Sequence, residues 1–573
     1  MTTATDMINA LVRLREALLG VSLPLDLPKV EQHRTARREL LDQIEDYALP
    51  RLMSIEAPLL TVVGGSTGAG KSTLVNSLVG SKVTEPGVLR PTTRSPVLIH
   101  NPVDAEWFQQ DRILPDLART NRSTADPRAL QLVSSDAIPA GVAVLDAPDV
   151  DSVDEGNRLL AAQLLGAADL WLFVTSAARY ADQVPWDYLR AAAERSTAVA
   201  IVLDRTPPDA IAEIRPHLTT MLNSRGLKDS PLFIVEESVI DHEGLLPPRS
   251  VAEIRVWLES LAADADARAA IVRRTLEGAV RTIARRSYEV SQASAEQIEM
   301  VERLRADAVQ AYADAIAKVD EASADGTLLR GEVLARWQEF VGTGELLKSL
   351  ESKVSWIRDK VVGWAKGKPA QVERITVAVE SGLESLITEH AESAAERASA
   401  SWRSLEAGRH LVEDSGRDLG RASRDCRARA ERTVRDWQQG VMNMVRAQGQ
   451  DKRSTARFLA LGVNGLSVAL MVVVFSSTGG VTGAEIGIAG GSAVLGQKLL
   501  EAVFGDQAVR TLAENARQDL HRRVAQLLGE ERGRFTETLD ALSIDPGSAT
   551  RLRDESRKID DLRFARQVAE ELG

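Results

Sequence analysis

The stretch "VVGGSTGAGKSTLVNSLVG", Val62 to Gly80, joins a run of β-branched residues to a helical pattern through four glycines and a lysine. The apolar run Leu59–Val63 predicts a buried strand, and Ser72–Leu78 predicts the first turns of a helix. Between them lies Gly65-x-x-x-x-Gly70-Lys71-Ser72, the pattern of a phosphate-binding P-loop. Its glycines let successive backbone N–H groups converge on one point, and the helix N-terminus adds a positive partial charge there.

Two residues of this loop have specific predicted roles. Lys71 supplies a mobile ammonium for the outer phosphates, and the Ser72 hydroxyl is a ligand for Mg²⁺. The alternative is a glycine-rich turn that binds nothing, but the flanking strand and helix are what the phosphate-binding mechanism requires. We therefore expect a bound nucleotide. The remaining predicted nucleotide-binding residues are Gly65, Ser66, Thr67, Gly68, Ala69, Gly70 and Thr73.

The composition limits the class of protein. The chain has 573 residues, 44% of them hydrophobic, which is enough for several domains with cores. Its net charge of −12 does not favour non-specific nucleic-acid binding. Cys426 is the only cysteine, so no intramolecular disulfide can form, which suits a reducing cytosol. The first twenty residues predict an amphipathic helix and not a signal peptide.

Proline divides the chain into two kinds of structure. Of the 21 prolines, only Pro369 and Pro546 follow residue 248, so the rest of the chain can hold very long helices. We expect N-terminal helices in 1–57 that pack with the C-terminal bundle, a nucleotide domain in 58–262 and a helical stalk or bundle in 263–573.

The nucleotide domain alternates apolar runs with helical stretches. This alternation predicts an α/β fold with a mostly parallel sheet, helices on both faces, and a ligand site at the carboxyl ends of the strands. The predicted strands are Leu59–Val63, Val97–Ile99, Val142–Leu145, Leu170–Val174, Ala198–Leu203 and Leu232–Val235.

Two further stretches fit this site. In "GVAVLDAPDVDS", Asp146 follows four apolar residues at the end of a strand, where a carboxylate can hold Mg²⁺ opposite Ser72. The alternative is an aspartate that merely ends a strand. In "RPTTRSPVLIH", Arg90 to His100, a threonine would ligate Mg²⁺ and sense the γ-phosphate. Its alternative is a plain turn between two prolines.

Taken in order, the P-loop, "TTRSPVLI", "LDAPD" and "VLDRTPP" are similar to the four guanine-nucleotide motifs of translation-factor-class GTPases. "TTRSPVLI" resembles the switch I segment of dynamins. A pair of helices before the nucleotide domain and long helices after it also fit that family. The chain thus resembles a bacterial dynamin-like GTPase, by its motifs over roughly 58–240 and by architecture beyond them.

The resemblance implies GTP and Mg²⁺ as ligands and hydrolysis of GTP as the activity. It makes Lys71, Thr93 and Asp146 catalytic and Ser72, Thr93 and Asp146 metal ligands, with Thr92 as a substitute for Thr93. Asp204 and Arg205 would lie at the base. It further implies membrane lipid as a partner, and a homo-oligomer formed through the G domains and the stalk.

Three positions depart from the family pattern. Asp149 stands where the third motif ends in glycine, and Gly68 replaces a serine that dynamins carry. The base-reading motif appears as Asp204-Arg205-Thr206-Pro207, so the carboxylate that pairs with guanine is missing unless Asp209 moves in.

Two other functions stay open: a scaffold that binds nucleotide with little hydrolysis, and an ATPase of another P-loop class. An ABC-type ATPase would need an LSGGQ-like signature, which is absent.

A hydrophobic segment interrupts the helical region. Phe458–Ala484 carries no charge, and a second uncharged run follows Glu485. We expect a helical hairpin over 456–504 that engages the inner face of the plasma membrane, with both large domains cytoplasmic. Basic residues flank both of its ends, as the positive-inside tendency requires. The alternative is a buried hairpin in a helical bundle. Glycines recur every four residues in this segment, which predicts a smooth stripe for close contact with a partner helix. They are Gly479, Gly483, Gly487 and Gly491.

Overall fold

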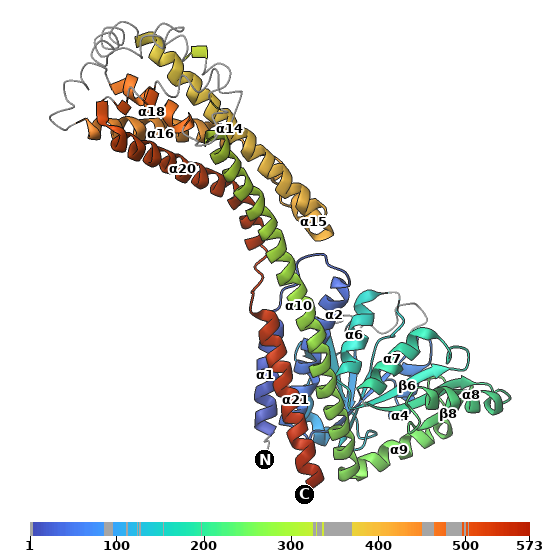
Figure 1. Ribbon diagram of the computed structural model, residues 1–573. Helices are drawn as coiled ribbons and strands as arrows, with labels where there is room; N and C mark the ends of the chain where they lie inside the picture. Colours follow the sequence, from blue (N-terminus) through green and yellow to red (C-terminus); the bar gives the residue numbers. More distant parts are fainter. Residues whose placement is uncertain are drawn as a thin grey trace, which may run out of the picture. The chain divides into compact units, whose positions relative to one another are not determined.

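The computed structural model forms two compact units, the first from Met1–Leu23, Pro28–Gln297 and Ile544–Gly573, and the second from Pro24–Leu27 and Ile298–Ser543 (Figure 1). The residues that it describes are 4–84, 95–109, 113–122, 124, 126, 128–152, 154–195, 197–324, 328, 335–336, 369–449, 463–476, 496–497, 500–501 and 503–572.

One sheet lies in the first unit. Its strands, in the part of the chain that the structure describes, run in the order β3-β4-β2-β5-β1-β6-β7-β8. Neighbouring strands are parallel except β2 and β5. The prediction of a mostly parallel sheet is confirmed. The strands are β1 (Leu59–Gly65), β2 (Val97–His100), β3 (Ala118–Thr120), β4 (Ala129–Ser134), β5 (Val142–Asp146), β6 (Leu170–Ser176), β7 (Ala198–Thr206) and β8 (Leu232–Glu236).

Helices cover both faces of this sheet (Figure 1). Leu60 and Val62 of β1 belong to a core shared with α6, α7 and α8, whereas Leu59 and Val63 belong to a core shared with α4 and α9. This alternation follows from the two-residue period of a strand. The helices are α4 (Lys71–Val79), α5 (Ala105–Gln109), α6 (Glu155–Gly166), α7 (Gln183–Glu194), α8 (Ile211–Ser224) and α9 (Ala252–Ala263), with short 3₁₀ turns at Pro102–Asp104 and Pro248–Ser250.

A small helical cluster completes the first unit. Leu11 and Leu14 of α1 are fully buried with Leu276 at the start of α10 and Leu552 of α21. Its elements are α1 (Ala4–Leu19), α2 (Val30–Gln43), a π-helical turn (Ile44–Ala48), α3 (Leu49–Met53), α10 (Ala265–Ala324) and α21 (Ser548–Leu572). The residues of α10 after Gln297 belong to the second unit.

The π-helical turn buries a carboxylate. Asp46 is 3% exposed, and its Oδ2 accepts a hydrogen bond of 2.8 Å from Gln163 of α6. Burial raises the pKa of Asp46 to about 7 in spite of that bond, and the carboxylates of Asp42, Asp116 and Glu45 raise it further. The ionised form of Asp46 is therefore disfavoured by folding.

We expect Asp46→Asn to stabilise the protein more at pH 8 than at pH 5. Since folding raises this pKa from an ordinary 3.8, the contribution of the wild-type carboxyl to stability is fully present below pH 3.8 and is lost as the pH rises through about 7, and the variant escapes this loss. Asparagine removes the charge, which contributes on the order of 1–3 kcal/mol at pH 8. Urea unfolding at both pH values measures it. Equal shifts in the two midpoints would contradict the assignment.

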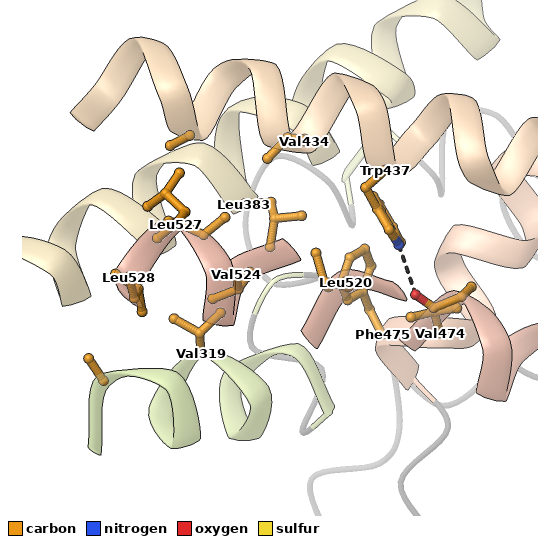
Figure 2. Close-up of a cluster of buried hydrophobic side chains, with 14 of the residues drawn as sticks. Val319, Leu383, Val434, Trp437, Val474, Phe475, Leu520, Val524, Leu527 and Leu528 are labelled. Atoms are coloured by element: carbon orange, nitrogen blue, oxygen red, sulfur yellow. Dashed lines mark hydrogen bonds between the residues drawn. The ribbon is translucent and has the colours of Figure 1, made fainter. Parts of the chain in front are cut away.

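The second unit is a helical bundle. Its helices, besides the end of α10, are α14 (Pro369–Arg403), α15 (Glu406–Asp414), α16 (Cys426–Gln448), α18 (Val463–Ser476) and α20 (Asp506–Asp540). Figure 2 shows part of its core, where Val319 of α10, Leu383 of α14 and Val524 of α20 converge with the rings of Trp437 and Phe475. The Trp437 indole N–H donates to the Ala516 carbonyl at 2.8 Å, and its ring centroid lies 5.6 Å from that of Phe475.

The described limb of the hydrophobic segment lies in this core. Helix α18 packs against α16 and α20, and Leu466 and the run Val468–Phe475 are buried. A helix that is apolar on all sides needs such cover. For this limb the structure shows the bundle-core alternative. Residues 456–462 and 477–495, with the four glycines of the predicted stripe, lie outside the described residues. Among the helices that are described, none combines the length and the apolar character that crossing a membrane takes.

Candidate nucleotide-binding site

The P-loop connects β1 to α4, and two of its glycines are required by close contacts. A Cβ atom on Gly65, at φ +147°, would lie 1.9 Å from the Val174 carbonyl oxygen of β6. A Cβ atom on Gly70, at φ +94°, would lie 1.9 Å from Asp204 Oδ2. Both backbone conformations are ones that glycine adopts readily. The two glycines thus let the loop pass directly against the carboxyl ends of β6 and β7.

Lys71 is the first residue of α4, and its ammonium turns back over the loop. Its Nζ donates to the carbonyl oxygens of Gly65 at 3.0 Å and Ser66 at 3.1 Å, and it forms an ion pair with Asp149. The side chain of Lys71 is only 4% exposed. The lysine is therefore held at the N-terminus of α4, where phosphate groups bind in P-loops.

Ser72 and Asp146 come together as the metal hypothesis requires. The Ser72 hydroxyl donates to Asp146 Oδ2 at 2.8 Å. Asp146 is fully buried, and among the described residues its Oδ1 has no hydrogen-bond partner. Burial raises the pKa of Asp146 to about 6, against the hydrogen bond from Ser72 and the charge of Lys71. A hydroxyl beside a buried carboxylate with an unpaired oxygen fits Mg²⁺, which prefers oxygen ligands.

A carboxylate in the loop that follows β5 binds the P-loop backbone. Asp151 Oδ1 accepts hydrogen bonds from the Thr67 N–H at 2.6 Å and from the Thr67 hydroxyl at 2.7 Å. Arg179, in the loop after β6, pairs with Asp151 at 2.6 Å and donates to the Thr67 carbonyl at 3.0 Å. Burial opposes ionisation of Asp151, but the bonds from Thr67 and Arg179 outweigh it and lower its pKa.

The predicted base-reading residues end β7 beside the P-loop. Asp204 is buried, which raises its pKa to about 6, although its Oδ1 accepts a hydrogen bond of 2.8 Å from the Arg205 N–H. Arg205 has φ +50° and an exposed side chain. Thr206 is buried, and its hydroxyl donates to the Leu203 carbonyl at 3.2 Å. Asp209 is exposed, in the turn that precedes α8.

The other predicted positions fall as follows. Ser66 and Ala69 are buried in the loop, Gly68 has open space around it at φ +75°, and Thr73 lies half-buried in α4. Thr92 and Thr93 lie outside the described residues. The described strand that follows them begins at Val97, which is the register partner of Asp146.

Sequence reasoning missed two residues of this arrangement. It noted Asp149 only as a departure from the family motif, and it assigned nothing to Asp151 or Arg179. The repeated acid in "DAPDVDS" is a signal that would have singled out Asp151. No local signal marks Arg179, which stands 112 residues after Thr67 in the chain.

Comparisons with known proteins found a curated relative and several solved structures. No family model matches it. A curated relative, the probable transmembrane GTPase FZO-like, chloroplastic, of Arabidopsis thaliana, is 21% identical over 215 residues, which is 35% of this chain and 22% of that protein's length.

Three solved structures are similar to the chain. One is a chain of an oligomerised bacterial dynamin pair that provides a mechanism for long-range sensing and tethering of membranes (11% identity, TM-score 0.35, 92% of this chain and 94% of that one). Another chain of such a pair has 13% identity and a TM-score of 0.27, over 72% and 78%. LeoA, a bacterial dynamin GTPase from ETEC, has 10% identity and a TM-score of 0.23, over 99% and 97%.

Proposed function

We propose that the chain is a dynamin-like GTPase that binds GTP with Mg²⁺ and hydrolyses it to drive membrane binding, remodelling, fusion or fission. One observation carries the proposal. The Lys71 ammonium, the Ser72 hydroxyl and the buried Asp146 carboxylate gather at the carboxyl ends of the strands around the P-loop. This is the donor and acceptor set that a magnesium nucleotide needs.

Hydrolysis by such a site needs no covalent intermediate, since positioning and charge neutralisation carry the catalysis. In the proposal, Lys71 holds the outer phosphates, and the N–H groups of the glycine-rich loop surround the inner ones. Ser72, Asp146 and Thr93 would hold Mg²⁺, which neutralises phosphate charge when bound. Thr93 would also orient the attacking water. Arg205 would cover the base, and Asp204 would lie beside it.

A second candidate is a scaffold that binds nucleotide with little hydrolysis. Asp149 favours it, because this residue presents a carboxylate to Lys71 in the place where the family motif supplies a glycine N–H. The missing guanine-pairing carboxylate after Asp204 points the same way, since it weakens selection of the base. The two candidates share the site and differ only in turnover.

Membrane attachment belongs to the same proposal. The uncharged run Phe458–Ala484 and its basic flanks support it. We propose that the protein lies at the cytoplasmic face of the plasma membrane as a homo-oligomer joined through its G domains and stalk. Nucleic acid is not among the proposed partners. Insertion would take α18 out of the bundle. Lipid tails are about as apolar as leucine side chains, so this exchange costs chiefly the close packing around residues such as Phe475.

We expect purified protein to release phosphate from GTP faster than from ATP, and faster still with anionic liposomes. The physical reason is that G domains gathered on a surface meet more often and complete one another's sites. Phosphate release and liposome co-sedimentation measure it together. Binding without turnover would favour the scaffold, and equal rates with ATP would reject the guanine assignment. Protein that never sediments with liposomes, with or without GTP, would remove the membrane part of the proposal.

A further inference from the structure

The loop after β5 places two carboxylates against donor groups of the P-loop. Asp149 pairs with the Lys71 ammonium, and Asp151 accepts from the N–H and the hydroxyl of Thr67. A P-loop offers these kinds of donor, an ammonium and backbone N–H groups, to phosphates. The acidic segment, Asp149–Asp151, thus occupies groups that the proposed function assigns to nucleotide.

The hydrogen bonds of Lys71 show which contact a phosphate has to replace. A lysine ammonium has three donors, and those of Lys71 meet the carbonyls of Gly65 and Ser66 and the carboxylate of Asp149. Gly65 belongs to β1 and Ser66 follows it directly, so their carbonyls are fixed to the sheet. Asp149 lies in a loop, its side chain can rotate, and that side chain is 15% exposed. A phosphate oxygen therefore reaches Lys71 by displacing Asp149.

The acidic segment is tied to the P-loop by more than this pair. The Val150 N–H donates to the Gly65 carbonyl at 3.3 Å, and Arg179 joins Asp151 to the Thr67 carbonyl. These bonds keep the displaced Asp149 carboxylate near the phosphate that replaces it. Two negative charges held close together repel each other, and partial burial strengthens that repulsion. A triphosphate carries more negative charge in total than a diphosphate, so the repulsion is larger for the triphosphate.

We propose that Asp149 is a competing anion for Lys71 that weakens triphosphate binding more than diphosphate binding, so that nucleotide binding requires the Asp149 side chain to turn away from Lys71. The inference rests on the proposed nucleotide-binding function and names a regulation of the same site. In this role Asp149 sets how strongly the site selects between the substrate and the product of hydrolysis.

The test uses the full chain, magnesium and fluorescent analogues of GTP and GDP. Asp149→Asn keeps the shape of the side chain and removes its charge. We expect it to bind the GTP analogue roughly ten- to a hundredfold more tightly than the wild type, because a hydrogen bond to a charged group contributes about that factor. The gain for the GDP analogue is expected to be smaller. Asp149→Glu keeps the charge and should stay close to the wild type.

A matched control separates competition at Lys71 from a change in net charge. Asp187→Asn removes the same charge from an exposed pair with Arg190 on α7 and should leave both affinities unchanged. Wild-type binding without a gain in Asp149→Asn would overturn the inference and leave the proposed function standing. An equal gain in Asp187→Asn would overturn it as well. If neither the wild type nor Asp149→Asn binds either analogue, the proposed function fails, and the inference with it.

Discussion

Lys71→Ala should abolish nucleotide binding while leaving the helical content unchanged. The ammonium is 4% exposed and is the cation that the structure places at the N-terminus of α4 over the P-loop. Removing one partner of a buried charged contact costs about 2–5 kcal/mol, which corresponds to a loss of affinity on the order of a hundredfold or more. Titration with a fluorescent GTP analogue measures the affinity, and far-ultraviolet circular dichroism measures the helices.

The control for this variant is Lys228→Ala, which removes the same charge from an exposed position in the first unit. It should bind as the wild type does. If Lys71→Ala also binds with wild-type affinity, the nucleotide is not held at the P-loop and the site assignment is wrong. A loss of helix in Lys71→Ala would instead show that the lysine supports the fold through its bonds to Gly65 and Ser66.

Trp437→Ala should destabilise the second unit by about 3–5 kcal/mol, the usual cost of deleting a large buried aromatic side chain. Trp437 is fully buried, and its ring packs beside Phe475 of α18 (Figure 2). The change opens a cavity between α16, α18 and α20 and removes the indole bond to Ala516. Urea unfolding followed by circular dichroism measures the loss.

Val377→Ala is the comparison, since Val377 is an apolar residue of the same bundle that is 56% exposed. Exposed substitutions of this kind usually change stability by no more than about 0.5 kcal/mol. Trp437→Ala with an equally small effect would show that α18 does not pack into the bundle in solution. The hydrophobic segment would then be available to lipid without any rearrangement of the helices.

Local pattern predicted the centre of the sheet well. All six apolar runs named in the sequence became strands, because each is an unbroken β-branched or leucine-rich run bounded by turn residues. The strands that were missed, β3 and β4, lie at one edge. Ala118–Thr120 is only three residues long, and Ala129–Ser134 mixes polar with apolar side chains. The antiparallel pairing of β2 with β5 had no sequence signal, since pairing depends on a partner more than forty positions away.

The site shows the same division. The P-loop is contiguous, so its glycines, Lys71 and Ser72 could be assigned from spacing alone, and Asp146 could be assigned from its place at the end of a strand. The contacts of the acidic segment could not. Asp149 meets Lys71 across 78 positions and Asp151 meets Thr67 across 84. Only the sheet order, with β5 beside β1, brings these residues together.

The sequence by itself determined that this chain has a glycine-rich loop of the P-loop pattern in an α/β domain and long helices after it. These follow from glycine geometry, the period of the side chains and the scarcity of proline after residue 248, all of which act between residues close together in the sequence. The tertiary structure alone decided where the apolar residues of α18 are buried. Hydrophobicity drives such residues out of water, but it is equally satisfied by lipid or by protein. In the structure α16 and α20 provide that cover, because their own apolar faces meet it in the bundle.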